Sequence, residues 1–293
     1  MLTYLHALLL FCGLFSMPLQ AQEKGVFWKI SGPELEKPSY LFGTIHLICE
    51  QDFKLSEEVA EKLKYADALV LEVDMDDPAL ALSMLSRMQN EDGESITDYL
   101  SEEEYKVIRQ MLIERTGMDL DMLKTMRPFI LMTLIYPNLL ECETKSYEHE
   151  LMKVAKAEEM DILGLESIDD QLSIFDRIPL DEQYRSFYEY AENLDRGRQE
   201  FRKLINTYLE EDIALLVKMV SESPEYRAYQ DILLDKRNHN WIAPMQELMK
   251  GSTVFFAVGA GHLGGENGLL NLLRKEGYTL TRMGNGKKLS EKR

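Results

Sequence analysis

The sequence is short of positive charge and of local catalytic signatures. Its 293 residues include 33 Lys and Arg against 51 Asp and Glu, which gives a formal net charge of −18. Binding to nucleic acid requires clustered Lys and Arg that neutralise phosphates, so this balance argues against a nucleic-acid-binding surface. There is also no G-x-S-x-G elbow, no P-loop and no H-E-x-x-H or C-x-x-C motif. Any active site must therefore be assembled from residues that lie far apart in the chain.

Cysteine is also scarce, and one of the three cysteines lies in an N-terminal segment that resembles a signal peptide. Residues 7–15 are apolar, and Pro18 and then Leu19-Gln20-Ala21 follow, which suits cleavage after Ala21. We therefore predict a signal peptide over residues 1–21 and an exported protein, periplasmic or secreted, with no membrane span after cleavage. No Lys or Arg precedes the apolar run, and the alternative is an uncleaved membrane anchor, although the run is barely long enough to span a bilayer.

Two cysteines remain after that cleavage, Cys49 and Cys142. An oxidising location outside the cytoplasm permits a disulfide, and two thiols are what one bridge needs. Two buried free cysteines are the alternative, and the sequence leaves the choice open.

Six apolar runs predict the strands of one sheet. Most of them are continuous rather than alternating, which is typical of strands that are covered on both faces. Between them the pattern is helical; Ser101 with Glu104 forms a capping box, and Gly117 is a plausible stop for the same helix. We therefore predict an α/β fold over residues 22–293, a single domain with a central mixed sheet built from both chain ends and helical insertions at about 78–158 and 168–250. The predicted strands are residues 26–30, 40–42, 68–71, 161–163, 253–258 and 278–283.

Two of the five histidines follow strands in matching contexts. In "YLFGTIHL" and in "FFAVGAGHLGG" a glycine, Gly43 or Gly259, ends an apolar run, and His46 or His262 follows three residues later. Glycine permits a sharp turn there, and the loops at strand ends are where α/β sheets place their ligand sites. One such histidine would usually be structural, but two in the same context indicate a site.

Two glutamates form a second matched pair. Glu72 ends the run in "DALVLEVD" and Glu166 ends the run in "DILGLESID", which places carboxylates where the core meets the loops. A buried carboxylate needs a cation, a metal or several donors. His46, Glu72 and His262 suit a catalytic Mn, Co or Zn ion, and Glu166 could carry the proton. In the alternative, Glu166 caps the following helix and Glu72 pairs with a basic residue.

In their order along the chain, these motifs resemble the TraB/GumN family, whose animal relatives are the TIKI proteins. The family carries two G-x-x-H motifs near opposite ends and a glutamate after the second strand. The corresponding segments are "GTIH" at 43–46, "LVLEVD" at 69–74 and "GAGH" at 259–262. "ILGLES" followed by Gln171 and "RN" at 237–238 also fit, whereas Glu148 in "SYEHEL" stands where an aspartate is common.

The resemblance implies an α/β core related to the erythromycin-esterase and haem-uptake ChaN-like fold. TIKI proteins are described as divalent-metal-dependent proteases that trim Wnt proteins. By carry-over, His46, Glu72 and His262 are the metal ligands, whereas Arg237 and Asn238 lie near the site. An arginine there could stabilise an oxyanion.

Together these observations predict an exported divalent-metal-dependent hydrolase, a peptidase that acts on a peptide or protein substrate. Its metal would be held by His46, Glu72 and His262, with Glu166, Arg237 and Asn238 as further catalytic residues. The alternative is a non-catalytic protein of the same fold that binds haem, a metal or a peptide signal.

Overall fold

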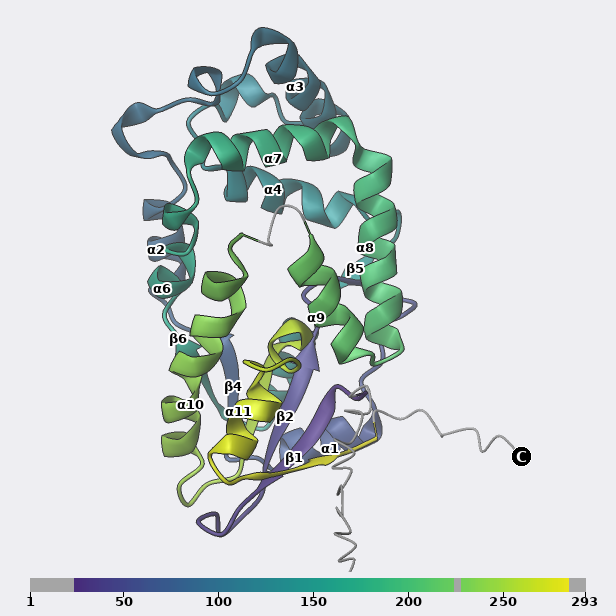
Figure 1. Cartoon of the computed structure of the whole chain (residues 1–293), viewed down its shortest axis with the longest axis vertical. Helices are drawn as coiled ribbons and strands as arrows, with labels where there is room; N and C mark the ends of the chain where they lie inside the picture. Colours follow the sequence, from purple (N-terminus) through teal and green to yellow (C-terminus); the bar gives the residue numbers. More distant parts are fainter. Residues whose placement is uncertain (1–23, 224–227, 285–293) are drawn as a thin grey trace, which may run out of the picture.

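A mixed six-stranded sheet lies in the lower half of the computed structural model as drawn in Figure 1, and the structure describes residues 24–223 and 228–284. All six predicted strands are confirmed, and the sheet does draw on both chain ends. The predicted signal peptide, residues 1–21, lies outside the described residues. In spatial order the strands are β6 (Asp161–Glu166), β4 (Ala68–Val73), β7 (Val254–Gly259), β2 (Ser39–Thr44), β1 (Phe27–Ser31) and β8 (Thr279–Arg282).

Strand direction brings four strand ends to one edge of the sheet. β6, β4, β7 and β2 run parallel to one another, whereas β1 is antiparallel to both β2 and β8. Thr44 at the end of β2 lies opposite Gly259 at the end of β7, and Val73 lies opposite Glu166. The carboxyl ends of the four parallel strands therefore meet at the same edge, where α/β sheets place their ligands.

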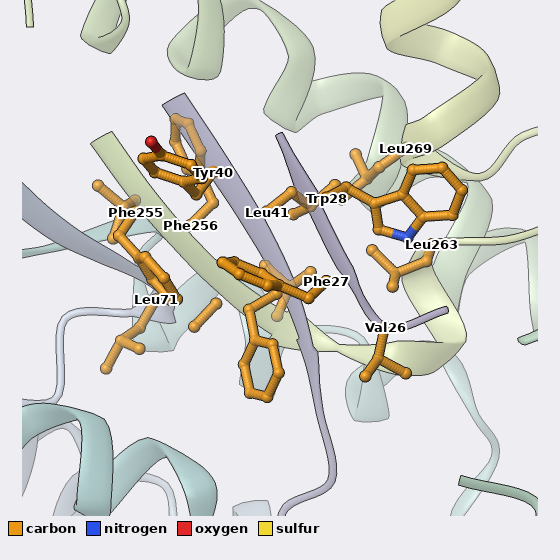
Figure 2. Packing of buried hydrophobic residues seen from close by; sticks show 14 of the residues in the cluster. Val26, Phe27, Trp28, Tyr40, Leu41, Leu71, Phe255, Phe256, Leu263 and Leu269 are labelled. Carbon is orange, nitrogen blue, oxygen red and sulfur yellow. The ribbon is translucent and has the colours of Figure 1, made fainter. Parts of the chain in front are cut away.

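The sheet is buried on both faces, as the continuous apolar runs predict. On one face the ring of Phe27 lies 5.9 Å from that of Phe255, and the ring of Phe42 lies 5.7 Å from that of Tyr147, the first residue of helix α5 (Tyr147–Ala157). On the other face Trp28 packs beside Leu263 and Leu269 (Figure 2). Removing this aromatic and aliphatic surface from water is the main force that holds the sheet between its helices.

Two helices from the insertions, α5 and α10 (Lys236–Leu248), and two from outside them, α1 (Glu57–Lys64) and α11 (Leu269–Lys275), cover the sheet. α1 and α5 contact each other on one face, and α10 and α11 contact each other on the opposite face (Figure 1). The amino end of α10 thereby reaches the edge at which the parallel strands end.

The two predicted helical stretches are helical, although the division into a single domain stays a prediction. α3 (Glu102–Thr116), α4 (Pro128–Ile135) and α7 (Leu180–Glu192) pack around a second hydrophobic cluster, away from β1 (Figure 1). The capping box of Ser101 and Glu104 and the stop at Gly117, with φ of 72°, are confirmed for α3. No helix among the described residues has the length and apolar character needed to cross a bilayer.

The remaining α-helices are α2 (Leu80–Ser86), α6 (Ile168–Leu172), α8 (Leu194–Leu209) and α9 (Ile213–Glu222). A π-helix, η6 (Asp231–Asp235), precedes α10, and the short 3₁₀ helices are Glu91–Gly93, Ile96–Asp98, Leu120–Met122, Tyr136–Asn138, Phe175–Arg177 and Ala260–His262.

A two-stranded ribbon that the sequence patterns do not predict joins the chain after β2 to the first insertion. β3 (Ile48–Cys49) pairs antiparallel with β5 (Thr144–Lys145). Cys49 and Cys142 form a disulfide with their Cα atoms 5.7 Å apart, which decides the choice that the sequence leaves open. The bridge spans 93 positions and fastens the segment that follows His46 to the segment that precedes α5. Strands of two residues carry too little pattern to be recognised before folding.

Candidate functional site

The edge where the parallel strands end gathers the predicted site residues. Glu72 lies in β4, Glu166 ends β6, and His46 follows β2 by two residues. His262 ends the 3₁₀ helix η7 (Ala260–His262) directly after β7, and Arg237 and Asn238 lie in the first turn of α10. The structure therefore brings all six predicted residues together from five separate segments.

Gly259 is the point around which three of these side chains converge. A Cβ atom added to Gly259 would lie 3.2 Å from Glu72 Oε1, 3.7 Å from His262 Cδ2 and 4.0 Å from His46 Nε2. The Gly259 N–H also donates to Glu72 Oε1 over 2.8 Å. Only a residue without a side chain leaves this space open, which explains the glycine at the end of β7.

Glu148 orients His46. The Nδ1 atom of His46 lies 2.8 Å from Glu148 Oε1, which also accepts from Thr44 Oγ1 over 2.7 Å. Ser146 Oγ donates to the other carboxylate oxygen over 2.6 Å. With Nδ1 held by Glu148, Nε2 is the ring nitrogen that faces the space beside Gly259. This is the arrangement in which a carboxylate fixes the tautomer of a metal-binding histidine.

The His46–Glu148 pair favours the charged form of both partners. Burial raises the pKa of Glu148, but the hydrogen bond and charge of His46 outweigh it and bring the pKa to about 2. For His46, burial lowers the pKa, but the hydrogen bond and charge of Glu148 raise it to about 9. The His46 side chain is 72% exposed, and its contact with Glu148 sets the direction of the shift. Protonated His46 is therefore favoured at neutral pH.

His262 is buried and neutral. Burial, followed by the charge of Arg237, lowers the pKa of His262 to about 3, although Glu72 opposes this. Its Nδ1 atom lies 2.6 Å from Asn238 Oδ1, and Asn238 Nδ2 donates to Asn267 O over 2.8 Å. The amide of Asn238 is thereby fixed so that its oxygen accepts from His262 Nδ1–H. The other ring nitrogen, Nε2, is left as an acceptor.

Arg237 is the cation at the centre of the cluster. Its Nη2 donates to Glu72 Oε2 over 2.6 Å and to Glu166 Oε1 over 2.7 Å, and its Nε also donates to Glu166. Its Nη1 donates to Leu233 O over 3.0 Å and lies 3.2 Å from His262 Nε2. These contacts use all five guanidinium N–H groups. The predicted oxyanion role of Arg237 therefore requires one of these bonds to be released.

The two glutamates differ in their protonation. Burial raises the pKa of Glu72, but electrostatic interactions with His262, Arg237 and His46, in that order, and the Gly259 N–H outweigh it and bring the pKa to about 2. Gln171 Nε2 donates to the same carboxylate over 3.2 Å. Burial, with the charge of Glu72, raises the pKa of Glu166 despite its contacts with Arg237 and Trp241. Glu72 is therefore a fixed anion, whereas Glu166 is the carboxylate that takes up a proton more readily.

Of the two alternative roles that the sequence allows for these glutamates, helix capping by Glu166 is wrong and pairing of Glu72 with a basic residue is confirmed. Helix α6 is capped by Ser167, whose side chain accepts from Asp170 N. The alternative that Glu166 caps this helix is therefore wrong, because its oxygens accept from Arg237 and from Trp241 Nε1, the latter over 3.1 Å. The alternative that Glu72 pairs with a basic residue is correct, and the residue is Arg237.

The donors fit a divalent metal in kind. His46, Glu72 and His262 offer two imidazole nitrogens and a carboxylate, and each histidine has its Nδ1 held by a side-chain acceptor. In positions 24–223 and 228–284, no three His, Cys, Asp or Glu side chains are close enough to hold one ion as they stand. Arg237 explains this, because it contacts both Glu72 and His262 Nε2. A metal at these donors would have to replace the bond between Arg237 and His262.

Several contact residues of the site were not assigned from the sequence. Glu148 lies 102 positions from His46, and its position in the family motif was the only signal for it. Trp241 stacks on the site, with its ring 4.5 Å from that of His262 and 4.8 Å from the Arg237 guanidinium carbon. Its place one helical turn after Arg237 was the available signal, since residues four apart share a helix face.

Comparison with known proteins extends these observations. Residues 26–282 match the TraB/PrgY/gumN family. "Uncharacterized protein YbaP" of Shigella flexneri is 24% identical over 246 residues, which cover 80% of this chain and 88% of the relative. The protein of the same name from Escherichia coli (strain K12) is 24% identical over 245 residues, which cover 80% and 87%. No solved structure matches, so the relation to the erythromycin-esterase and ChaN-like fold stays a prediction. The family match spans nearly the whole described chain, and this protein belongs to the TraB/PrgY/gumN family.

Proposed function

We propose that this protein is an exported divalent-metal-dependent hydrolase that acts on a peptide or protein substrate. The observation that carries the proposal is the convergence of His46 Nε2, Glu72 Oε1 and the His262 ring around Gly259. These three residues would hold Mn, Co or Zn. Such an ion lowers the pKa of a bound water and polarises a substrate carbonyl.

The charge balance of the cluster supports a divalent cation. Glu72, Glu166 and Glu148 are three carboxylates, whereas Arg237 supplies one permanent positive charge, and His46 supplies a second only while it is protonated. With His46 neutral, as a ligand must be, the cluster has a net charge of about −2. A divalent cation would neutralise it, which is the usual requirement for buried carboxylates.

Arg237 is placed to stabilise negative charge on a substrate. One Nη1–H is directed at His262 Nε2 in the present arrangement. When the lone pair of His262 Nε2 is given to a metal, this N–H loses its acceptor and becomes free to donate to a substrate oxygen. A preorganised donor of this kind stabilises the oxyanion that forms during acyl transfer.

Glu166 is placed to carry a proton. Its side chain is only 10% exposed, its pKa is raised, and Arg237 and Trp241 fix its orientation. A carboxylate with a raised pKa can take a proton from the attacking water and return it to the leaving amine. Asn238 has a positioning role, because it contacts the metal candidate His262 rather than the space beside Gly259.

Two features support export. The apolar N-terminal segment suits a signal peptide. The bridge between Cys49 and Cys142 is of a kind that forms and persists in oxidising compartments.

A non-catalytic metal-binding role is the second candidate. The observation that favours it is the complete use of the Arg237 donors, which leaves no N–H free for a substrate. This candidate predicts metal binding without turnover.

The first prediction concerns the ligands. His46→Ala and His262→Ala should each remove most of the bound Mn, Co or Zn, measured by mass spectrometry of metal in purified protein. His239→Ala is the matched control, because His239 is exposed on the same helix as Arg237 and should load like the wild type. Normal loading of both site variants would refute the ligand assignment.

The second prediction concerns pH. Because the pKa of His46 is raised to about 9, a proton competes with the metal below that pH. Metal affinity should therefore increase by roughly tenfold per pH unit as pH rises toward 9. Glu148→Gln removes the charge that raises this pKa, so its affinity should level off nearer the ordinary histidine value of about 6.5. Identical pH profiles for wild type and variant, measured by titration calorimetry, would contradict the role of Glu148.

The third prediction concerns Glu166. Glu166→Gln should keep the metal but lower turnover by roughly 10²–10⁴, since the amide cannot carry the proton. Asp169→Asn, on α6 with a side chain 59% exposed, is the control and should leave turnover unchanged. Unchanged turnover in Glu166→Gln would exclude the proton-carrying role. Loss of the metal from this variant would overturn the assignments of both glutamates.

A further inference from the structure

A cavity of about 220 Å³ is lined in part by Asn238 and Gly261, which adjoin His262 of the cluster around Gly259. Its walls come from α9, from the π-helix η6 with the start of α10, and from the glycine-rich segment after β7, which lies between these helices (Figure 1). The lining residues used below are Val217, Leu234, Asp235, Asn238, Gly261 and Glu266. Its volume is below the roughly 300–1,000 Å³ that encloses a drug-sized ligand, so it suits a single side chain.

Two residues connect the cavity to the site. Asn238 lines the cavity and also accepts from His262 Nδ1 over 2.6 Å. Gly261 lines the cavity and directly precedes His262. The cavity therefore adjoins His262 on the side of its Nδ1 atom, and a substrate bound at the cluster would extend past His262 to place a neighbouring side chain in it.

The chemistry of the walls selects for a cation. Asp235 and Glu266 supply carboxylates, whereas Val217 and Leu234 supply apolar surface. Asp235 accepts from Asn267 Nδ2 over 3.1 Å, and within the described chain neither carboxylate forms an ion pair with Lys or Arg. The carboxylates of the proposed metal site differ in this respect, because each of them pairs with a basic side chain. Arg237 pairs with Glu72 and Glu166, and His46 pairs with Glu148.

We propose that this cavity is a substrate subsite for a Lys or Arg side chain near the scissile bond, on the far side of His262. The apolar walls cover the methylene stem, and Asp235 and Glu266 bind the charged head through charge-assisted hydrogen bonds. Its meaning as a subsite rests on the proposed hydrolase function, whereas its ability to bind a cationic side chain does not.

The binding test uses acetyl-arginine amide and its uncharged analogue acetyl-norleucine amide as probes in ligand-detected NMR, with the full mature chain. The arginine probe should bind to the wild type and to Asp231→Asn, a control in η6 whose carboxylate pairs with Lys236 rather than lining the cavity. The double variant Asp235→Asn/Glu266→Gln should bind it about ten- to hundred-fold more weakly, as loss of charged hydrogen bonds predicts. Equal binding to wild type and double variant would overturn the proposal.

A second variant tests the cavity without changing charge. A Cβ at Gly261 meets no atom within 4 Å, and its φ lies outside the left-handed region, so Gly261→Val can project into the open space. This variant should also lose the arginine probe while keeping its melting temperature. Retained probe binding in a folded Gly261→Val protein would contradict the assignment of the cavity.

Digestion of a peptide library separates this proposal from the hydrolase proposal. Cleavage by the wild type should concentrate beside Lys or Arg, and the double variant should lose about ten- to hundred-fold in kcat/KM for those sequences alone. Probe binding that depends on Asp235 and Glu266, without any cleavage, supports the cavity and refutes the hydrolase. Cleavage without preference for Lys or Arg supports the hydrolase and refutes the subsite.

Discussion

The ion pairs that Arg237 makes with Glu72 and Glu166 are the interaction on which the site depends. Both carboxylates are only 10% exposed at the ends of parallel strands, where an unpaired charge would cost several kcal/mol. The fold meets this cost by directing the first turn of α10 at the sheet edge. Trp241 packs against the guanidinium and donates to Glu166, so the helix delivers both the cation and its support.

The contacts of Arg237 also explain why His46, Glu72 and His262 are of the right kind for a metal but are not all available to bind one in this arrangement. Arg237 compensates part of the negative charge and takes the free nitrogen of His262, whereas Glu148 holds His46 so that its Nε2 faces the space beside Gly259. The disulfide and the β3–β5 ribbon fasten the segment after His46 to the segment before Glu148. The two histidines are therefore held differently. Arg237 contacts the Nε2 atom of buried His262, whereas Glu148 holds the Nδ1 atom of His46 and leaves the rest of that ring exposed to solvent.

Much of this arrangement could be predicted from the sequence, because it follows from strand ends. Parallel strands end at one edge, so the residues that follow them in the chain must meet there, and His46, Glu72, Glu166 and His262 do so. The pairing of His46 with Glu148 could not be predicted, since it depends on how an insertion folds back over 102 positions. The complete engagement of the Arg237 donors is likewise a three-dimensional property, which no spacing along the chain encodes.

The central claim is that His46, Glu72 and His262 bind a metal in place of the bond between Arg237 and His262. Anomalous diffraction at the zinc edge, from crystals equilibrated with zinc, tests this most directly. The account predicts an anomalous peak bonded to Nε2 of both histidines and to the Glu72 carboxylate, with Arg237 Nη1 no longer on His262. Crystals that contain zinc elsewhere, or none, while Arg237 keeps its bond to His262, would contradict it.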